Sequence, residues 1–225
     1  YDKDNNLITS QIKNKEGKYL TLSEINKHTI DAFISYEDKN FYKHKGFDFK
    51  RILKSLFINL VNFRYISGGS TITQQYARTI FLNNNKSLLR KIKEAYYTIK
   101  LELKYSKDEI LEGYLNTINY GHGKYGIENA SKFYFGKSAS ELSLAEASIL
   151  AGIPKAPSKY SPITNYENAK NRQILILNNM YDVLVNYRYD RNKHIYIYLV
   201  QLFVVVYFSI YTNLIVNYIF YNNDS

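Results

Sequence analysis

The sequence predicts a mainly α-helical protein, and three observations lead to this prediction. Apolar residues recur three and four positions apart along most of the chain, as they do on one face of a helix. Short connections that contain glycine separate these stretches, and Gly68-Gly69 and Gly121-His122-Gly123 are the clearest. No sequence period indicates a repeat protein. Cysteine is absent, which excludes disulfides and cysteine-ligated metal sites and leaves stability to packing alone.

The helices can be placed in order along the chain. Residues 1–20 are polar and rich in turn formers, and they are predicted to be an extended lead-in. The first helical pattern begins near Leu22, with Ser23 as its predicted N-cap before Ile25. Further helices are predicted over 48–63, 72–82, 87–104, 107–118, 125–135, 141–152 and 165–187.

Residues 188–225 form an atypical hydrophobic tail. Residues 195–221 are 27 positions without a formal charge, enough to span a bilayer as a helix, yet their Tyr, Val and Ile content favours a strand. Arg188, Arg191 and Lys193 would be drawn to the cytoplasmic side, so a membrane anchor here would place the preceding domain inside the cell. An alternative hypothesis is that the chain from about residue 184 onward is out-of-frame sequence. Truncation after Tyr187 should then leave activity unchanged.

The chain carries 30 Lys and Arg against 20 Asp and Glu, a net charge of +10. This excess favours an anionic partner, which can be a nucleic acid, an anionic membrane surface or a phosphorylated substrate. Charge alone leaves these three classes open.

Five segments of the chain carry distinctive motifs: EDKNFYKHKGFD at 37–48, GGSTITQQYAR at 68–78, RKIKE at 90–94, the stretch from Ile110 to Glu128, and the stretch from Leu144 to Pro157. In this order and spacing they resemble glycosyltransferase family 51, the peptidoglycan glycosyltransferase (transglycosylase) domain of class A penicillin-binding proteins and monofunctional transglycosylases. The resemblance covers about residues 20–187, so the glycosyltransferase domain is predicted over 21–187.

The resemblance implies a lysozyme-like helical lobe with a smaller membrane-associated subdomain. The implied reaction polymerises lipid II into β-1,4 glycan strands with inversion and releases polyprenyl diphosphate. The implied partners are lipid II, the growing glycan strand, the membrane and a moenomycin-type inhibitor, with no nucleic acid. The implied location is the cell membrane, with the catalytic domain on the extracytoplasmic face. No cofactor is required, although a divalent cation, Mg or Mn, held in part by Glu94, is an optional aid.

Glu37 is the candidate general base. It ends a helical pattern and precedes a turn with aromatic residues and glycine, an environment that can partly desolvate a carboxylate. Taken alone, an acidic pair at a helix end is more often a solvated helix cap or an ion-pair partner. The resemblance implies that Glu37 deprotonates the 4-hydroxyl of the acceptor N-acetylglucosamine, while Asp38 and His44 are structural.

A lipid diphosphate leaving group needs cations near the bond that breaks. Arg78 lies about one turn beyond Gln75, and Arg90 and Lys91 follow, although Arg90 and Glu94 also fit a surface ion pair. The resemblance implies that Arg78, Arg90 and Lys91 bind the diphosphate and that Glu94 is a second catalytic acid. The family normally has Lys at the position of Arg78, so the cation is kept but its geometry changes.

Other polar residues divide into two groups. The resemblance implies donor-site contacts by Gly69, Ser70, Thr71 and Gln75, with Gly68-Gly69 as a flexible loop. A structural role is expected for Glu112, Tyr114 and Asn116.

Residues 48–66 mix basic and apolar side chains, which fits a helix in the headgroup layer as well as a core helix. Two rival functions remain open: a lysozyme-like hydrolase or lytic transglycosylase, which needs no diphosphate clamp, and a non-catalytic membrane-bound scaffold.

Overall fold

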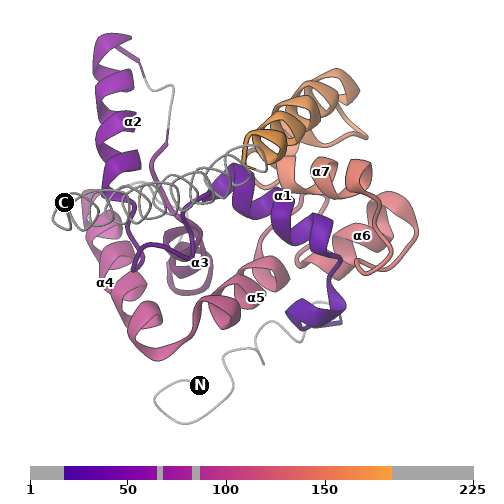
Figure 1. Ribbon diagram of the computed structural model, residues 1–225, viewed down its shortest axis with the longest axis horizontal. Helices are drawn as coiled ribbons and strands as arrows, with labels where there is room; N and C mark the ends of the chain where they lie inside the picture. Colours follow the sequence, from indigo (N-terminus) through magenta and orange to yellow (C-terminus); the bar gives the residue numbers. More distant parts are fainter. Residues whose placement is uncertain (1–17, 65–67, 83–86, 184–225) are drawn as a thin grey trace, which may run out of the picture. The chain divides into compact units, whose positions relative to one another are not determined.

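The computed structural model describes residues 18–64, 68–82 and 87–183, and this part of the chain is built from helices (Figure 1). The elements are a 3-10 turn η2 (Leu22–Glu24) and the helices α1 (Lys27–Glu37), α2 (Phe49–Val61), α3 (Ile72–Phe81), α4 (Leu88–Lys104), α5 (Lys107–Thr117), α6 (Ile127–Phe135), α7 (Leu144–Gly152) and α8 (Pro157–Tyr160). Residues 166–183 are also helical. In these ranges the β-pairing amounts to one isolated bridge, Asn119 to Tyr125. The predicted class, mainly α, is confirmed.

Side-chain caps determine where several helices begin. The Asp48 carboxylate accepts a hydrogen bond from the Arg51 N–H at 3.0 Å and starts α2. Ser87 caps α4, and Thr71 with Gln74 forms a capping box at α3. Each cap satisfies an N–H group that has no partner within its own helix. The predicted ranges 48–63, 72–82 and 87–104 therefore agree closely with α2, α3 and α4.

The prediction that Ser23 caps the first helix is wrong. The Glu24 carboxylate accepts a hydrogen bond from the Thr21 N–H at 2.9 Å, and this local contact closes η2 around Ser23. The first α-helix begins after Asn26, whose side chain accepts from the His28 N–H at 2.9 Å. Polar side chains near a helix start compete for the same backbone donors, so the cap position is decided by small differences.

The helices α6 and α7 begin two and three residues later than the predicted 125 and 141. Gly126 has a φ of +81°, which no continuing right-handed helix allows, so α6 starts at Ile127. Ser143 and Glu146 form a capping box, so α7 starts at Leu144.

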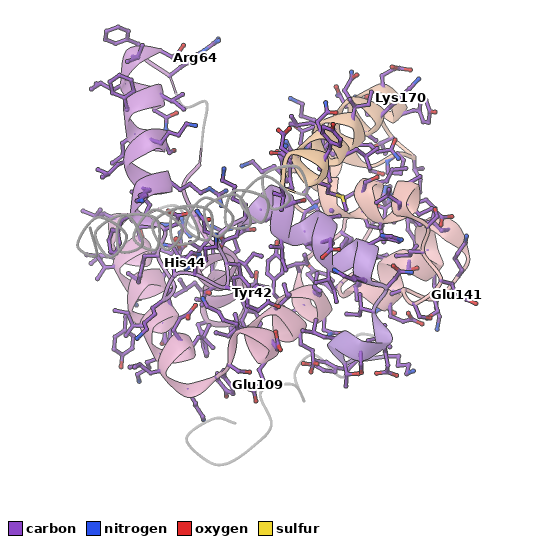
Figure 2. The ribbon with its side chains drawn as sticks, in the orientation of Figure 1. Tyr42, His44, Arg64, Glu109, Glu141 and Lys170 are labelled. Carbon is purple, nitrogen blue, oxygen red and sulfur yellow. The ribbon has the colours of Figure 1, made fainter. Side chains whose placement is uncertain are left out.

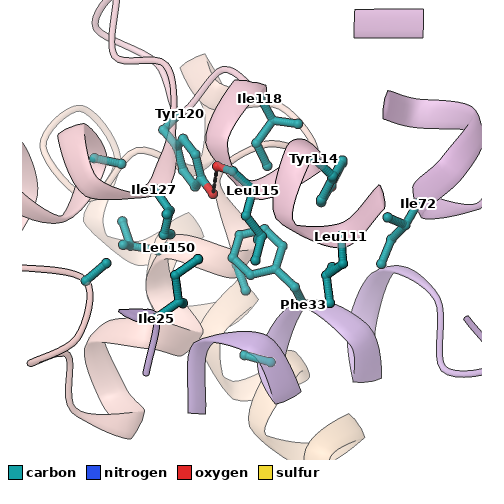
Figure 3. Close-up of a cluster of buried hydrophobic side chains, with 14 of the residues drawn as sticks. Ile25, Phe33, Ile72, Leu111, Tyr114, Leu115, Ile118, Tyr120, Ile127 and Leu150 are labelled. Carbon is teal, nitrogen blue, oxygen red and sulfur yellow. Dashed lines mark hydrogen bonds between the residues drawn. The ribbon is translucent and has the colours of Figure 1, made fainter. Parts of the chain in front are cut away.

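The core surrounds α5, which packs against α3 and α6 (Figure 3). Its Leu111, Tyr114 and Leu115 are fully buried, and Phe33 of α1 meets Tyr114 edge to face at 6.1 Å between ring centroids. The Tyr120 hydroxyl donates to the Leu115 carbonyl at 3.4 Å. Because α5 is buried on nearly all sides, it is the central helix of the core. Truncating Phe33 of α1, which packs on α5, to Ala should lower the free energy of unfolding by about 3–5 kcal/mol.

In the helix α2 most of the apolar side chains are exposed. They are Phe49, Leu53, Leu56, Phe57, Leu60 and Val61. Figure 1 shows α2 extending away from α5 and α6, and Figure 2 places Arg64 beyond its outer end, far from His44. In the ranges that the structure describes, no helix is both long and apolar enough to cross a membrane. The predicted membrane association of 48–66 stays a prediction.

The ends of the chain lie mostly outside the described residues. Only 18–20 of the predicted lead-in are described, and the tail at 188–225 is wholly outside, together with the hypotheses about it.

Candidate active site

Glu37, the last residue of α1, is a buried carboxylate with one oxygen free. The residue as a whole is 5% exposed. The Gln75 side-chain amide donates to Glu37 Oε2 at 2.8 Å, whereas Glu37 Oε1 is buried and has no hydrogen-bond partner. An unmet acceptor in a buried site is costly unless a ligand supplies the donor. Oε1 can therefore accept a hydrogen bond from a bound donor group.

Tyr114 orients the amide that holds Glu37. Its hydroxyl donates to Gln75 Oε1 at 3.3 Å, which leaves the Gln75 Nε2 group to face the carboxylate. Burial, and then the nearby charge of Glu37, raises the pKa of Tyr114 well above its ordinary value, so the hydroxyl keeps its proton. Only a structural role was predicted for Tyr114, because its position inside a helix gives no sign of this contact.

The turn after Glu37 ties three elements together. The Asp38 carboxylate is buried, accepts the Ile72 N–H at 3.0 Å at the start of α3, and meets His44 Nε2 at 3.0 Å. The Arg51 guanidinium of α2 donates to the Glu37 carbonyl. Asp38 and His44 thus have the structural contacts expected of them, and these contacts hold the base at the junction of α1, α2 and α3.

Glu94 of α4 is the second buried carboxylate, and three cations surround it. Its side chain has no exposed surface, and Arg78 Nη1 lies 3.7 Å and Arg90 Nη1 3.5 Å from its Oε2, while Lys91 bonds its Oε1. Lys91 also reaches Ser70 Oγ at 3.3 Å. The cations remain 38%, 20% and 47% exposed in the same order. They can therefore bind an anion from solvent while Glu94 holds them together.

One face of α3 joins the two carboxylates. Gln75 and Arg78 are three residues apart, so they share a helix face, and the first contacts Glu37 while the second contacts Glu94. The predicted residues Glu37, Gln75, Arg78, Arg90, Lys91, Glu94 and Ser70 are thus brought into two linked groups. Their predicted catalytic and binding roles stay predictions.

Thr71 and Gly69 have structural contacts. The Thr71 hydroxyl donates to the Gly46 carbonyl at 2.7 Å and caps α3, so it is already engaged within the fold. A Cβ at Gly69 would lie 3.1 Å from the Ile52 Cα, so glycine lets this loop approach the backbone of α2. The predicted donor contacts and loop flexibility are not tested by these distances.

A second basic cluster lies beside the end of α1. A cavity of ≈ 450 Å³ is lined by Tyr36 and Asn179 and by four cationic side chains, those of Lys39, Lys50, Arg51 and Lys54. This cluster was not predicted as a site, because the basic side chains of 48–66 were interpreted only as part of a headgroup helix or a core helix. The spacing of Lys50 and Arg51 from Lys54, four and three residues along α2, was the available signal.

The residues present do not fit a protein-held divalent cation. In the described ranges no three His, Asp or Glu side chains come together as ligands. Glu94 is already surrounded by three positive charges, which repel a further cation. The optional cation stays an untested prediction.

Comparisons with known proteins identify the family of the chain. A family model described as Transglycosylase matches residues 4–181. The chain is 54% identical over 162 residues to penicillin-binding protein 2D of Bacillus subtilis (strain 168), covering 72% of this chain and 23% of that protein. It is 46% identical over 162 residues to penicillin-binding protein 1A of Aquifex aeolicus (strain VF5), covering 72% and 22%.

Among solved structures, penicillin-binding protein 1A from Haemophilus influenzae aligns with a TM-score of 0.41 and 25% identity, over 74% of this chain and 15% of that chain. The chain thus spans less than a quarter of the length of these relatives. Because the family model extends over most of the sequence and the relatives align across 72% of it, the chain belongs to the transglycosylase family of peptidoglycan glycosyltransferases, glycosyltransferase family 51.

Proposed function

We propose that this domain polymerises lipid II into β-1,4 glycan strands and releases polyprenyl diphosphate. The observation that supports it most is the pairing of a buried carboxylate that has one free oxygen with a separate cluster of three cations, both held by α3. Transfer from a lipid diphosphate needs one group that accepts a proton and another that stabilises the negative leaving group.

In the proposed reaction, Glu37 Oε1 takes the proton of the acceptor's 4-hydroxyl as the oxygen attacks the anomeric carbon of the donor N-acetylmuramic acid. The bond to the diphosphate oxygen breaks on the opposite face, so the α-linked donor becomes a β-1,4 linkage. Arg78, Arg90 and Lys91 hold the diphosphate as its charge develops, and Glu94 keeps the three cations grouped. Gln75 and Tyr114 keep the base in place.

The cationic cavity beside α1 suits the second substrate. When a strand grows at its reducing end, the incoming acceptor is itself a lipid II molecule with a diphosphate. Lys39, Lys50, Arg51 and Lys54 line a cavity next to the residue that carries the base, on the side of α2. Two diphosphates on either side of one base account for two separate basic clusters.

The exposed apolar face of α2 suits the membrane in which polyprenyl chains lie. Leu53→Glu and Leu60→Glu should each reduce co-sedimentation with vesicles of phosphatidylglycerol and phosphatidylethanolamine. Ile163→Glu, an exposed apolar residue outside α2, is the matched control and should sediment as the parent chain does. Equal loss in all three variants would reject a membrane role for α2. The proposed location is the cell membrane, with the catalytic domain on the extracytoplasmic face; the role of α2 supports the membrane but not the choice of face.

An assay with labelled lipid II tests the function. Polymer is the expected product, and a moenomycin-type inhibitor should block its formation. Digestion of mature sacculi without polymer would identify a lytic enzyme, and no turnover of either substrate would identify a scaffold. The cation clusters favour synthesis, because cleavage of a neutral glycosidic bond needs no diphosphate clamp.

A further inference from the structure

Arg172, in the helical stretch 166–183, is a buried cation held by aromatic rings. It is 9% exposed, and its Cζ lies 4.1 Å from the ring centroid of Tyr36 and 4.7 Å from that of Tyr160. Across the described part of the chain, no carboxylate is within ion-pair distance of it. A guanidinium group stacks on aromatic faces as an ammonium group cannot, so the stabilisation comes from its planar shape.

The hydrogen-bonding state of Arg172 is unusual. Its Nε and Nη2 groups are buried and have no acceptor. These two N–H groups lie on one edge of the guanidinium, the edge that elsewhere binds a carboxylate. Unmet buried donors disfavour folding, and proteins retain such features mainly where function requires a particular arrangement. The arginine is therefore better explained by the stacking of its guanidinium plane on the two tyrosine rings than by its charge.

The surrounding backbone makes room for this side chain. A Cβ at Gly152, the last residue of α7, would lie 2.7 Å from Arg172 Cγ, so only glycine allows the side chain to pass. The C-terminal end of a helix also favours a nearby cation. Arg172 consequently links the stretch 166–183 with α7, with Tyr160 at the end of α8, and with Tyr36 near the end of α1.

Tyr36 immediately precedes Glu37, so the arginine acts on the turn that carries the base. We propose that Arg172 is a positioning residue: by holding the Tyr36 ring it sets the last turn of α1 and hence the direction of the Glu37 carboxylate. Burial raises the pKa of Tyr36, while the charge of Arg172 opposes the shift, as expected of a close pair. This inference rests on the proposed role of Glu37.

The competing explanation is that Arg172 only stabilises the fold. The positioning role and the purely stabilising role predict changes in different quantities. A stabilising contact alters the fraction of folded protein, whereas displacement of a base by about 1 Å can lower the rate of the folded enzyme by about 10²-fold. Rates per folded molecule therefore separate them.

The experiment measures kcat and KM for labelled lipid II in the full chain, with the folded fraction followed by circular dichroism. Arg172→Met should lower kcat per folded molecule by about 10- to 100-fold with KM within about twofold, and Tyr36→Leu should lower kcat by a similar factor. Tyr36→Phe, which keeps the ring but alters a side chain that lines the cationic cavity, should lower kcat less than Tyr36→Leu does. The double variant Arg172→Met/Tyr36→Leu should be no slower than the slower single variant, because both break one contact.

Lys170→Met is the matched control, since Lys170 lies on the same helical stretch, is exposed, and sits 6.0 Å over the Tyr166 ring. It should leave kcat unchanged. If Arg172→Met lowers thermal stability but leaves kcat per folded molecule within about twofold, the positioning role is rejected. If Arg172→Met does not fold, Tyr36→Leu decides by the same criterion. Glu37→Gln separates the two proposals: an active Glu37→Gln enzyme rejects the base, whereas an inactive one with a normal Tyr36→Leu rejects only the role of Arg172.

Discussion

Glu37 and Glu94 are both buried carboxylates that contact α3, yet their surroundings are opposite. Glu37 has one amide partner and one oxygen without a hydrogen bond. Glu94 has three cations around it. The cations engage both oxygens of Glu94, so neither oxygen is open to a substrate hydroxyl group. Glu37 Oε1 has no such partner.

The difference in their partners suggests that Glu37 and Glu94, both predicted from the sequence to be catalytic, have separate roles. Glu37 is suited to proton transfer, and Glu94 is suited to holding the cations that meet the diphosphate. Burial alone does not separate the two residues, whereas the charge and number of their partners do. Each prediction below tests one side of this division, in order of decreasing expected effect.

Replacing the base should have the largest effect. Glu37→Gln preserves size and the contact with Gln75 but removes the proton acceptor, so polymerisation should fall by about 10²–10⁴-fold. Thermal unfolding should be close to that of the parent chain. The measurement is the initial rate of lipid II polymerisation, and a rate near that of the parent would remove Glu37 from the reaction.

Removing a cation should have the next largest effect. Arg78→Ala and Arg90→Ala each take one positive charge from the developing leaving group, and kcat/KM should fall by about 10²–10³-fold. Arg78→Lys keeps the charge and should be far milder. Lys132→Ala removes an exposed cation that pairs with Glu128 away from Glu94, and it controls for net charge. Wild-type kinetics in both alanine variants would reject the clamp.

Glu94→Gln should have a smaller effect on the rate and a clear effect on stability. Three cations then lose their shared counter-charge, and the free energy of unfolding should fall by about 1–3 kcal/mol, a value reduced because the cations reach solvent. The cations remain present, so kcat/KM should fall by only about tenfold. If Glu94→Gln were as inactive as Glu37→Gln while fully stable, Glu94 would be a reacting group and the division would be wrong.

Tyr114→Phe should have the smallest effect. It removes the hydroxyl that donates to Gln75 at 3.3 Å but keeps the ring against Phe33. Loss of one such hydrogen bond is worth about 0.5–1.5 kcal/mol, so the rate should fall by about two- to tenfold. Tyr120→Phe, which removes a buried hydroxyl that bonds the Leu115 carbonyl, is the matched control and should leave the rate unchanged. Equal losses in the two variants would show that the Tyr114 hydroxyl acts only on the fold.

The core helices could be predicted because local chemistry decides them. Apolar spacing gave α3, α4 and α5, and the cap residues Ser87 and Ser106 set two of their starts. The error at Ser23 arose where several polar side chains compete for the same backbone donors, and the outcome depends in part on the contact of Asn26 with Ser140, 114 residues away. The same limit hid Tyr114, because its contact with Gln75 joins residues 39 positions apart.

By itself the sequence determined the helical class, the family and the residue types available for chemistry, because periodicity, caps and motifs are local properties of the chain. Only the tertiary structure decided which oxygen of Glu37 is free, which cations meet at Glu94, and that Arg172 stacks on Tyr36. These depend on distances between helices that are far apart in the chain. Burial and charge at a side chain are set by those neighbours, and no local pattern encodes them.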